Sequence, residues 1–347
     1  MFKSVKPKAQ APERQPMKTI PQLSQLSFLL IATALLAACG GGGGGAPATV
    51  LVTVPAALAP EAAAPAYSAG SEESNTLALL NQERSNCGFG LLKQNAKLDQ
   101  SAAAHAAYLV QNSLLHGHRE DPALPGFTGR NETERAAAVG YLNPVSAVLA
   151  TLSGPPVAAS TLTSTAQVRG LLASPYHLLS MLESVSDVGV GHRKKVGTDG
   201  VERQALNITM GRVEGVNDLD ASQAYSYPCE GSTGVNAGLA DETPSPIPSN
   251  LSQNNKLFGT PIALKVRTGR VLVVISAIVT PTAGGPAVAV QIVSQANNTP
   301  RPDLMRANDA YVLPLSVLQP GTSYTVQLAA TNDGQPFSKS FSFTTAN

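Results

Sequence analysis

The side chains best suited to chemistry are a few histidines, carboxylates and cysteines that lie far apart along the chain. His116 and His118 share one short segment, His-Gly-His-Arg-Glu, and His177 follows 59 positions after His118. Imidazole nitrogens together with a carboxylate can bind zinc, and a histidine beside an acid can act in general acid/base catalysis. This wide spacing alone does not indicate a metal, so any such site depends on the fold.

Sequence signatures of common enzyme and nucleic-acid-binding classes are absent. No Gly-x-Ser-x-Gly nucleophile elbow occurs, and the glycine run at 40–45 lacks the Lys-Ser/Thr of a phosphate-binding loop. The net charge of +1 gives no electrostatic case for nucleic acid. Tryptophan is absent and aromatic residues make up 5% of the chain, which argues against stacking platforms for sugars or bases. The sequence therefore carries no signature of a common hydrolase or of a phosphate-binding or nucleic-acid-binding protein.

The N-terminal segment has the pattern of an export signal. A basic opening precedes the uncharged apolar run 26–38, which is shorter than the roughly 20 residues needed to span a bilayer. The run ends Leu-Ala-Ala-Cys-Gly at 36–40, which resembles the lipobox of bacterial lipoproteins. That resemblance implies cleavage before Cys39, lipidation of its sulfur with acyl chains such as palmitate, and, with Gly40, delivery to the outer membrane. Met17 is an alternative start of the chain.

We expect residues 1–39 to be this signal peptide and residues 40–70, rich in Gly, Ala and Pro, to be a tether from membrane to protein. The partners implied are a membrane, through Cys39, and no nucleic acid. The other two cysteines, Cys87 and Cys229, are candidates for one disulfide in an exported protein. It would close a loop of 142 residues, worth roughly 4–5 kcal/mol by loop entropy. Two buried free thiols are the alternative.

Residues 71–232 show helical patterns followed by strand patterns, which predicts an α+β domain. A helix should start near Asn75 and end at Cys87, and a second should start near Asn95. His105 lies on the apolar stripe of this second helix, so we expect it to be a buried structural residue. Further helices are expected over 132–139 and 164–172 and from 144 to 149, with strands at 188–191 and 205–210.

Residues 233–255 are rich in Pro, Ser and Asn and are expected to form a linker, and residues 256–347 a second domain. Short apolar runs at 262–266, 271–279, 288–293, 311–315, 324–330 and 337–343 predict a small all-β sandwich. The segment LQPGTSYTV at 318–326 resembles a corner of fibronectin type III and Ig-like domains. That resemblance implies that Tyr324 is a buried corner tyrosine. We expect this domain to be a spacer or an adhesive module.

Four segments of the first domain resemble the CAP superfamily, also called the SCP domain, which includes cysteine-rich secretory proteins, antigen 5 and plant pathogenesis-related proteins. They are LLNQERSNCGFGLLKQNAKLDQSAAAHAAYLVQNSLLHGH at 79–118, ERAAAVGY at 134–141, SPYHLLSML at 174–182 and SDVGVG at 186–191. Their order and spacing carry the resemblance over about 160 residues. It implies an α-β-α sandwich built on a central antiparallel sheet.

The family's cleft holds two histidines and two acids that can bind a metal such as zinc. The resemblance places the histidines at His118 and His177 and one acid at Asp187. The second acid falls at Ala147, which cannot bind a metal. Weaker candidates near the cleft are His116, Glu120 and Glu183.

The resemblance therefore leaves two functions open. The first is a tethered module that binds a lipid, peptide or cell-wall ligand in a degenerate histidine/acid cleft. The alternative is a metal-dependent, endopeptidase-like hydrolase that acts through His118, His177 and Asp187. A third reading is a purely structural envelope protein whose working part is the sandwich.

Overall fold

The structure is a computed structural model that describes residues 66–115, 117–155, 163–251, 257–297 and 299–347. The expected signal peptide, the lipidation site Cys39, most of the tether and His116 lie outside these residues. No helix within the described ranges is long and apolar enough to cross a membrane.

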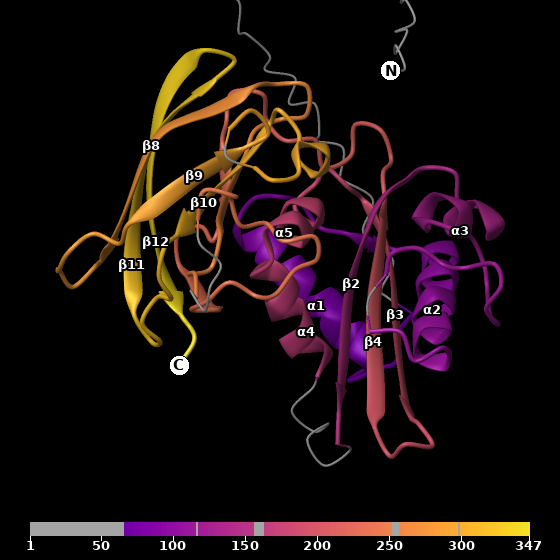
Figure 1. Ribbon diagram of the computed structural model, residues 1–347. Coiled ribbons are helices and arrows are strands. Elements are labelled where there is room, and N and C mark those ends of the chain that lie inside the picture. The colour runs from indigo at the N-terminus through magenta and orange to yellow at the C-terminus, as the bar shows by residue number, and fades with distance from the viewer. Residues whose placement is uncertain (1–65, 116, 156–162, 252–256, 298) are drawn as a thin grey trace, which may run out of the picture. The chain divides into compact units, whose positions relative to one another are not determined.

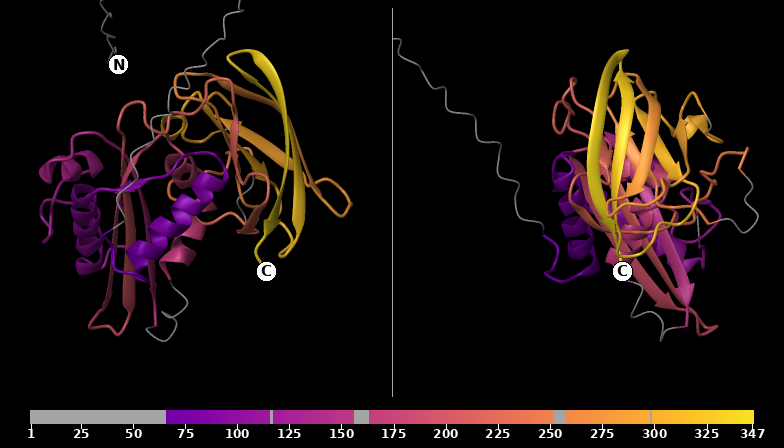
Figure 2. Two further views of the ribbon diagram at one scale, coloured as in Figure 1. Left: turned by 180° about the vertical axis from the view of Figure 1, so that it is seen from behind. Right: turned by 90° about the vertical axis from the view of Figure 1, so that its left-hand side faces the viewer.

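The first domain has three layers, with helices on both faces of a four-stranded sheet. Its elements are α1 (Glu72–Asn86), β1 (Lys93–Gln94), α2 (Ala96–Gln111), α3 (Glu132–Ala138), β2 (Pro144–Gly154), α4 (Ser164–Leu172), α5 (Pro175–Met181), β3 (Asp187–Val196) and β4 (Glu202–Gly211). The strand order is β1-β3-β4-β2; β1 runs parallel to β3 and the other pairs are antiparallel. Helices α2 and α3 cover one face, and α1, α4 and α5 cover the other (Figures 1 and 2). The expected α+β class and sandwich are confirmed.

Local sequence signals explain where these helices start and how closely they pack. Asn95 caps α2 because its side-chain oxygen accepts from the N–H of Lys97 at 3.0 Å. Helix α1 starts one turn earlier than expected, since Ser71 rather than Asn75 is its cap. Helix α2 lies directly on β3, because a Cβ at Gly189 would stand 2.0 Å from helix backbone. Glycine at this position therefore permits the close contact between helix and sheet.

The prediction of a helix from residue 144 to 149 is wrong, because this segment begins the long strand β2. Its register with β4 runs from Ala147, opposite Thr209, to Gly154, opposite Glu202. Val145 and Val148 are β-branched and favour an extended backbone. Pairing with β4 thus decides the conformation of a segment that is short and ambiguous by pattern alone.

The second domain is a sandwich of two four-stranded sheets. One sheet has the order β5 (Tyr225–Tyr227), β7 (Ile262–Lys265), β10 (Asp309–Pro314), β9 (Val290–Ser294); the other has β6 (Ser232–Val235), β12 (Gln335–Thr345), β11 (Ser323–Asn332), β8 (Leu272–Pro281). A short 3₁₀ helix, η2, spans Pro302–Leu304. All six predicted runs form strands. Tyr324 is the buried corner tyrosine, and its hydroxyl accepts from the N–H of Gln319 at 2.9 Å.

Two strands of the sandwich come earlier in the chain than the sequence analysis placed that domain. Strand β5 lies within residues 71–232, yet it pairs with β7, and β6 pairs with β12. The chain then returns to the first domain, where the N–H of Ala240 donates to the carbonyl of Ala173 at 3.0 Å. The segment expected to be a free linker is therefore held against both domains, since Tyr311 also donates to the carbonyl of Pro246 at 2.6 Å.

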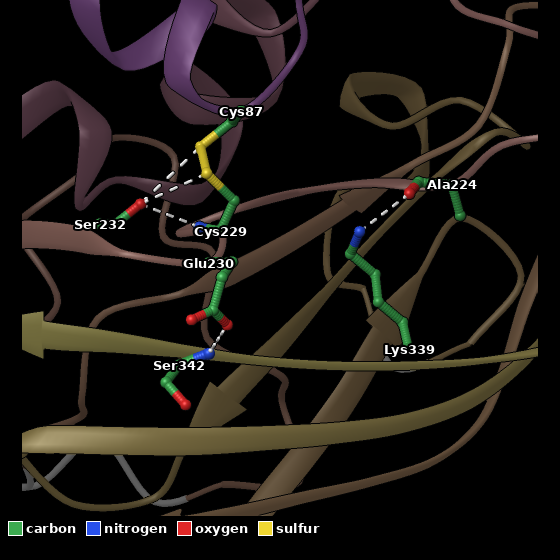
Figure 3. The surroundings of a disulfide bond; sticks show 7 residues. All are labelled: Cys87, Ala224, Cys229, Glu230, Ser232, Lys339 and Ser342. Carbon is green, nitrogen blue, oxygen red and sulfur yellow. Dashed lines mark hydrogen bonds between the residues drawn. A yellow bond between two sulfur atoms is a disulfide. The ribbon is translucent and has the colours of Figure 1, made fainter.

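A disulfide and a buried ion cluster join the two domains. Cys87, which caps the end of α1, is bonded to Cys229, as expected from the sequence (Figure 3). The ion cluster is centred on Lys265 of β7, whose ammonium contacts Asp309 of β10 and lies 2.9 Å from Glu183 of the first domain. Arg306 adds a further contact to Glu183 at 3.0 Å.

Candidate functional site

The fold brings together the two histidines that lie 59 residues apart in sequence. His118 follows α2 in a loop, and His177 lies in the first turn of α5. Their rings are 5.7 Å apart between centroids, with an interplanar angle of 28°. Pro175 at the first position of α5 fixes where this short helix begins and so positions His177.

Both histidines line a cleft of about 560 Å³ in the first domain. The cleft is lined by the run 149–153 of strand β2, by residues of α4, by His177 of α5 and by the segment 240–243. Leucine side chains from the loop after α2, from β2 and from α4 make much of the surface apolar: Leu115, Leu149, Leu152 and Leu171. A cleft that is mostly apolar with a few polar groups is typical of a ligand site.

Glu242 is a charged residue of the cleft that the sequence patterns do not indicate. Its Oε1 lies 2.5 Å from Nδ1 of His177. The same carboxylate accepts the backbone N–H groups of His177, at 2.8 Å, and Tyr176, at 3.0 Å. The contact between Nδ1 of His177 and the carboxylate is within ion-pair distance but is not a hydrogen bond, since Nδ1 has no hydrogen-bond partner among the described residues. Nothing in the Pro- and Ser-rich sequence around Glu242 signals this role.

Asp187 does not lie in the cleft, contrary to the expectation from the sequence. Its carboxylate accepts from Asn95 at 3.2 Å and from the hydroxyl of Tyr141 at 3.0 Å. Asp187, the first residue of β3, pairs with Gly211 of β4, and so does Pro144, the first residue of β2. The cleft begins five residues further along β2, at Leu149. Because the register shifts between Pro144 and Ser146, these five residues correspond to four residues of β4, from Gly211 to Asn207, or about 13 Å of extended strand. Asp187 therefore holds the start of the sheet rather than a ligand.

The weaker carboxylate candidates are also used elsewhere. Glu120 is buried, where it pairs with His105 at 2.9 Å and accepts the N–H of Thr128 at 2.6 Å. Burial alone would raise the pKa of Glu120, but these hydrogen bonds lower it, so the group stays ionised. His105 is fully buried in this network, as expected. Glu183 belongs to the ion cluster with Lys265.

The described residues do not fit zinc as they stand. A zinc site needs three or four protein ligands, and the cleft offers the imidazoles of His118 and His177. Ala147 has no donor, and the Glu242 carboxylate is taken by His177 and by backbone N–H groups. Across the described part of the chain, no three His, Cys, Asp or Glu side chains are grouped so that they could hold a metal.

His118 is kept neutral by its surroundings. Burial lowers the pKa of His118 to about 4, and the nearby His177, His105 and Arg135 act in the same direction. The unfolded chain, in which this group has its ordinary pKa of 6.5, therefore binds a proton first as the pH falls. Titration of His118 therefore leaves the free energy of unfolding unchanged above pH 6.5. As the pH falls from 6.5 to 4, protonation of this residue in the unfolded chain lowers the free energy of unfolding.

We expect His118→Gln to flatten the pH dependence of stability. Between pH 7 and pH 4.5 the wild type should lose about 2 kcal/mol more unfolding free energy than the variant, because only the wild type gains a proton on unfolding at residue 118. Urea unfolding followed by circular dichroism at the two pH values measures this difference. Equal losses in both proteins would contradict it.

Comparison with known proteins assigns the first domain to a family. Residues 77–201 match the model of the cysteine-rich secretory protein family, CAP. No curated protein matches the chain. Among solved structures, an outer surface protein from Borrelia burgdorferi is 14% identical, with a TM-score of 0.31; the match covers 42% of this chain and 97% of that one.

Two further solved structures are similar in part. An extracellular protein containing a SCP domain from Bacillus anthracis is 18% identical with a TM-score of 0.30, over 41% of this chain and 40% of that one. The chain thus spans about two fifths of the Bacillus protein. A copper resistance protein from Escherichia coli is 16% identical with a TM-score of 0.21, over 35% of this chain and 94% of that one. The family model thus identifies residues 77–201 as a CAP domain within this chain.

Proposed function

We propose that this chain is an extracytoplasmic binding protein that is anchored to the outer membrane through a lipid on Cys39 and takes a ligand in its CAP-domain cleft. The observation that carries the proposal is the cleft of about 560 Å³ with leucine-rich walls and the polar group of His118, His177 and Glu242. Such a surface can bury a ligand and orient it by a few hydrogen bonds. The ligand can be a lipid, a peptide or a cell-wall fragment, because all three are found outside the cytoplasm.

The chain has no tryptophan, so a single introduced tryptophan reports on the cleft alone. Leu115 lines the cleft and is 38% exposed, which makes Leu115→Trp a suitable reporter. We would titrate this variant with three probes: phosphatidylglycerol vesicles, muropeptides from digested peptidoglycan, and a pool of end-capped octapeptides. The proposal predicts a saturable change in tryptophan fluorescence with at least one probe.

Gly170 supplies a matched pair of cleft variants. It lines the cleft on α4, and a Cβ placed there meets no described atom within 4 Å. In the reporter protein, Gly170→Leu should fill the cleft and abolish the fluorescence response. Gly170→Ala should preserve the response and raise stability by about 0.5–1 kcal/mol, because alanine favours helix. No response to any of the three probes, or a response unaffected by Gly170→Leu, would overturn the proposal.

Metal-dependent hydrolysis is the second candidate, favoured by the close approach of the two imidazoles and by the carboxylate beside His177. Because a third ligand is missing among the described residues, we expect zinc to bind the wild type no more tightly than His118→Ala/His177→Ala. Isothermal titration calorimetry of both proteins with zinc measures the two affinities. Wild-type affinity at least about tenfold above that of the double variant would favour the hydrolase instead.

The anchor has its own test. Cys39→Ala should move the protein from the membrane fraction to the soluble extracytoplasmic fraction, because acyl chains on one cysteine supply the attachment. Mass spectrometry of the N-terminal peptide should show diacylglycerol on Cys39 in the unaltered protein. An unmodified Cys39 peptide would contradict the lipid anchor but not the proposed binding of a ligand in the cleft.

A further inference from the structure

The wall of the cleft formed by β2 is the open edge of a β-sheet. Strand β2 is last in the order β1-β3-β4-β2, and among the described residues no strand pairs with its outer side (Figure 1). Five consecutive residues, 149–153, line the cleft. Because successive side chains point to opposite faces of a sheet, a cleft over one face would contact alternate residues. Contact with all five means that the cleft runs along the strand edge.

The hydrogen bonds of the neighbouring strands show which backbone groups of β2 point outward. The N–H of Val190 on β3 donates to the hydroxyl of Tyr67 at 3.0 Å and to the carboxylate of Asp99 at 3.1 Å, so it points away from β4. Its partner on β4 is Ile208. In an antiparallel sheet, Ile208 must then turn its backbone groups toward β2, where it faces Val148.

Alternation along β2 fixes the remaining groups. The register with β4 is unbroken from residue 146 to 154, so Val148, residue 150 and residue 152 face β4. The N–H and C=O groups of Leu149, Thr151 and Ser153 therefore point to the open side. All three residues line the cleft. This row of backbone donors and acceptors, left without a partner strand among the described residues, is a template for an added strand.

A second, independent feature in the cleft points to an amide ligand. Gln167 of α4 lines the cleft and is 4% exposed, yet within the described part of the chain neither its Oε1 nor its Nε2 has a hydrogen-bond partner. An unpartnered buried carboxamide destabilises the fold. It presents one donor and one acceptor side by side, which match the C=O and N–H of a peptide group or of an amide side chain.

We infer that the cleft binds an extended peptide segment of about five residues as an additional β-strand along residues 149–153, with the Gln167 carboxamide bonded to one of its amide groups. Main-chain hydrogen bonds to Leu149, Thr151 and Ser153 supply affinity, and the leucine walls receive alternate side chains. The inference rests on the proposed binding function and names the ligand class and the mode of binding.

The test uses peptides in which the pairing edge is removed chemically. The Leu115→Trp reporter is titrated with the pool of end-capped octapeptides and with a matched pool that is N-methylated at every position. The methylated pool should bind at least about tenfold more weakly than the parent pool, because neither edge of its strand can donate in any register. Equal binding of the two pools would overturn the strand-addition mode.

Gln167→Leu should weaken binding of the octapeptide pool about tenfold and raise the melting temperature, since it removes an unpartnered buried amide. Gln204→Leu is the control, because Gln204 is equally buried on β4 but does not line the cleft. Unchanged binding by Gln167→Leu would refute its role. If vesicles or muropeptides saturate the reporter and octapeptides do not, this inference fails while the binding function stands; if no probe binds, both fail.

Discussion

Lys265→Met is expected to lower the free energy of unfolding by about 3–5 kcal/mol. Lys265 is 1% exposed and lies between Glu183 of the first domain and Asp309 of the second. Burial alone would lower the pKa of Lys265, but the two carboxylates hold it above its ordinary value, so the group is charged. Removing it leaves the buried Asp309 carboxylate without its cation, and leaves Glu183 with the half-exposed Arg306 as its remaining described partner.

Equilibrium urea unfolding at pH 7 measures this loss. Arg306→Met is the matched control, because Arg306 contacts the same Glu183 from a half-exposed position; its loss should stay below about 1 kcal/mol. The triple variant Lys265→Met/Glu183→Gln/Asp309→Asn should recover part of the stability, since it removes the uncompensated charges. A loss below about 1 kcal/mol for Lys265→Met would show that the cluster does not hold the domains together.

Replacing both Cys87 and Cys229 with alanine is the second change with a large expected effect. The bond closes a loop with a sequence separation of 142, and loop entropy gives a loss of about 4–5 kcal/mol when it is removed. Both half-cystines are buried, and the N–H of Cys229 donates to the hydroxyl of Ser232 at 3.0 Å. A Cys39→Ala background leaves these two as the remaining cysteines of the chain.

Thermal and urea unfolding of the double variant, beside the same background with the bond intact, measure the loss. Ser232→Ala is the control for local packing and should cost about 1 kcal/mol, because it removes the hydrogen bond to Cys229 and keeps the covalent link. Reduction of the intact protein should reproduce the effect of the double variant. A double variant within about 1 kcal/mol of the background would contradict the entropic account.

Much of the fold follows from local patterns in the sequence. The stripe that contains Leu98 and His105 predicts a helix against a core, and alternation in runs such as 324–330 predicts the strands of the sandwich. Segment 144–149 fails because a stretch this short, without a clear period, fits a helix as well as a strand. Strands β5 and β6 are not predicted from the sequence, because they are only three and four residues long. They pair with strands that lie far away along the chain.

The residues of the cleft are harder to predict from the sequence than the helices and strands are. The resemblance brings His118 and His177 to one place, and the structure does the same. It also assigns Asp187, whose position at the start of β3 is set by pairing with β4 and lies away from the cleft. Glu242 comes from a segment that looks like a linker, because two adjacent acids, Asp241 and Glu242, followed by prolines and serines show no periodic pattern. Its role depends on two N–H groups at the start of α5, which only the folded chain brings to it.

The covalent link also determines how the protein would carry mechanical load. Tension applied to the two ends of the chain passes from Cys87 directly to Cys229, so the intervening residues bear none of it. Stretching the oxidised protein should therefore release about 480 Å less contour length than stretching the reduced one, at about 3.4 Å per residue. His118, His177 and strand β2 lie inside the protected loop. Glu242 lies outside it, so tension can draw this carboxylate away from the cleft while the loop stays closed.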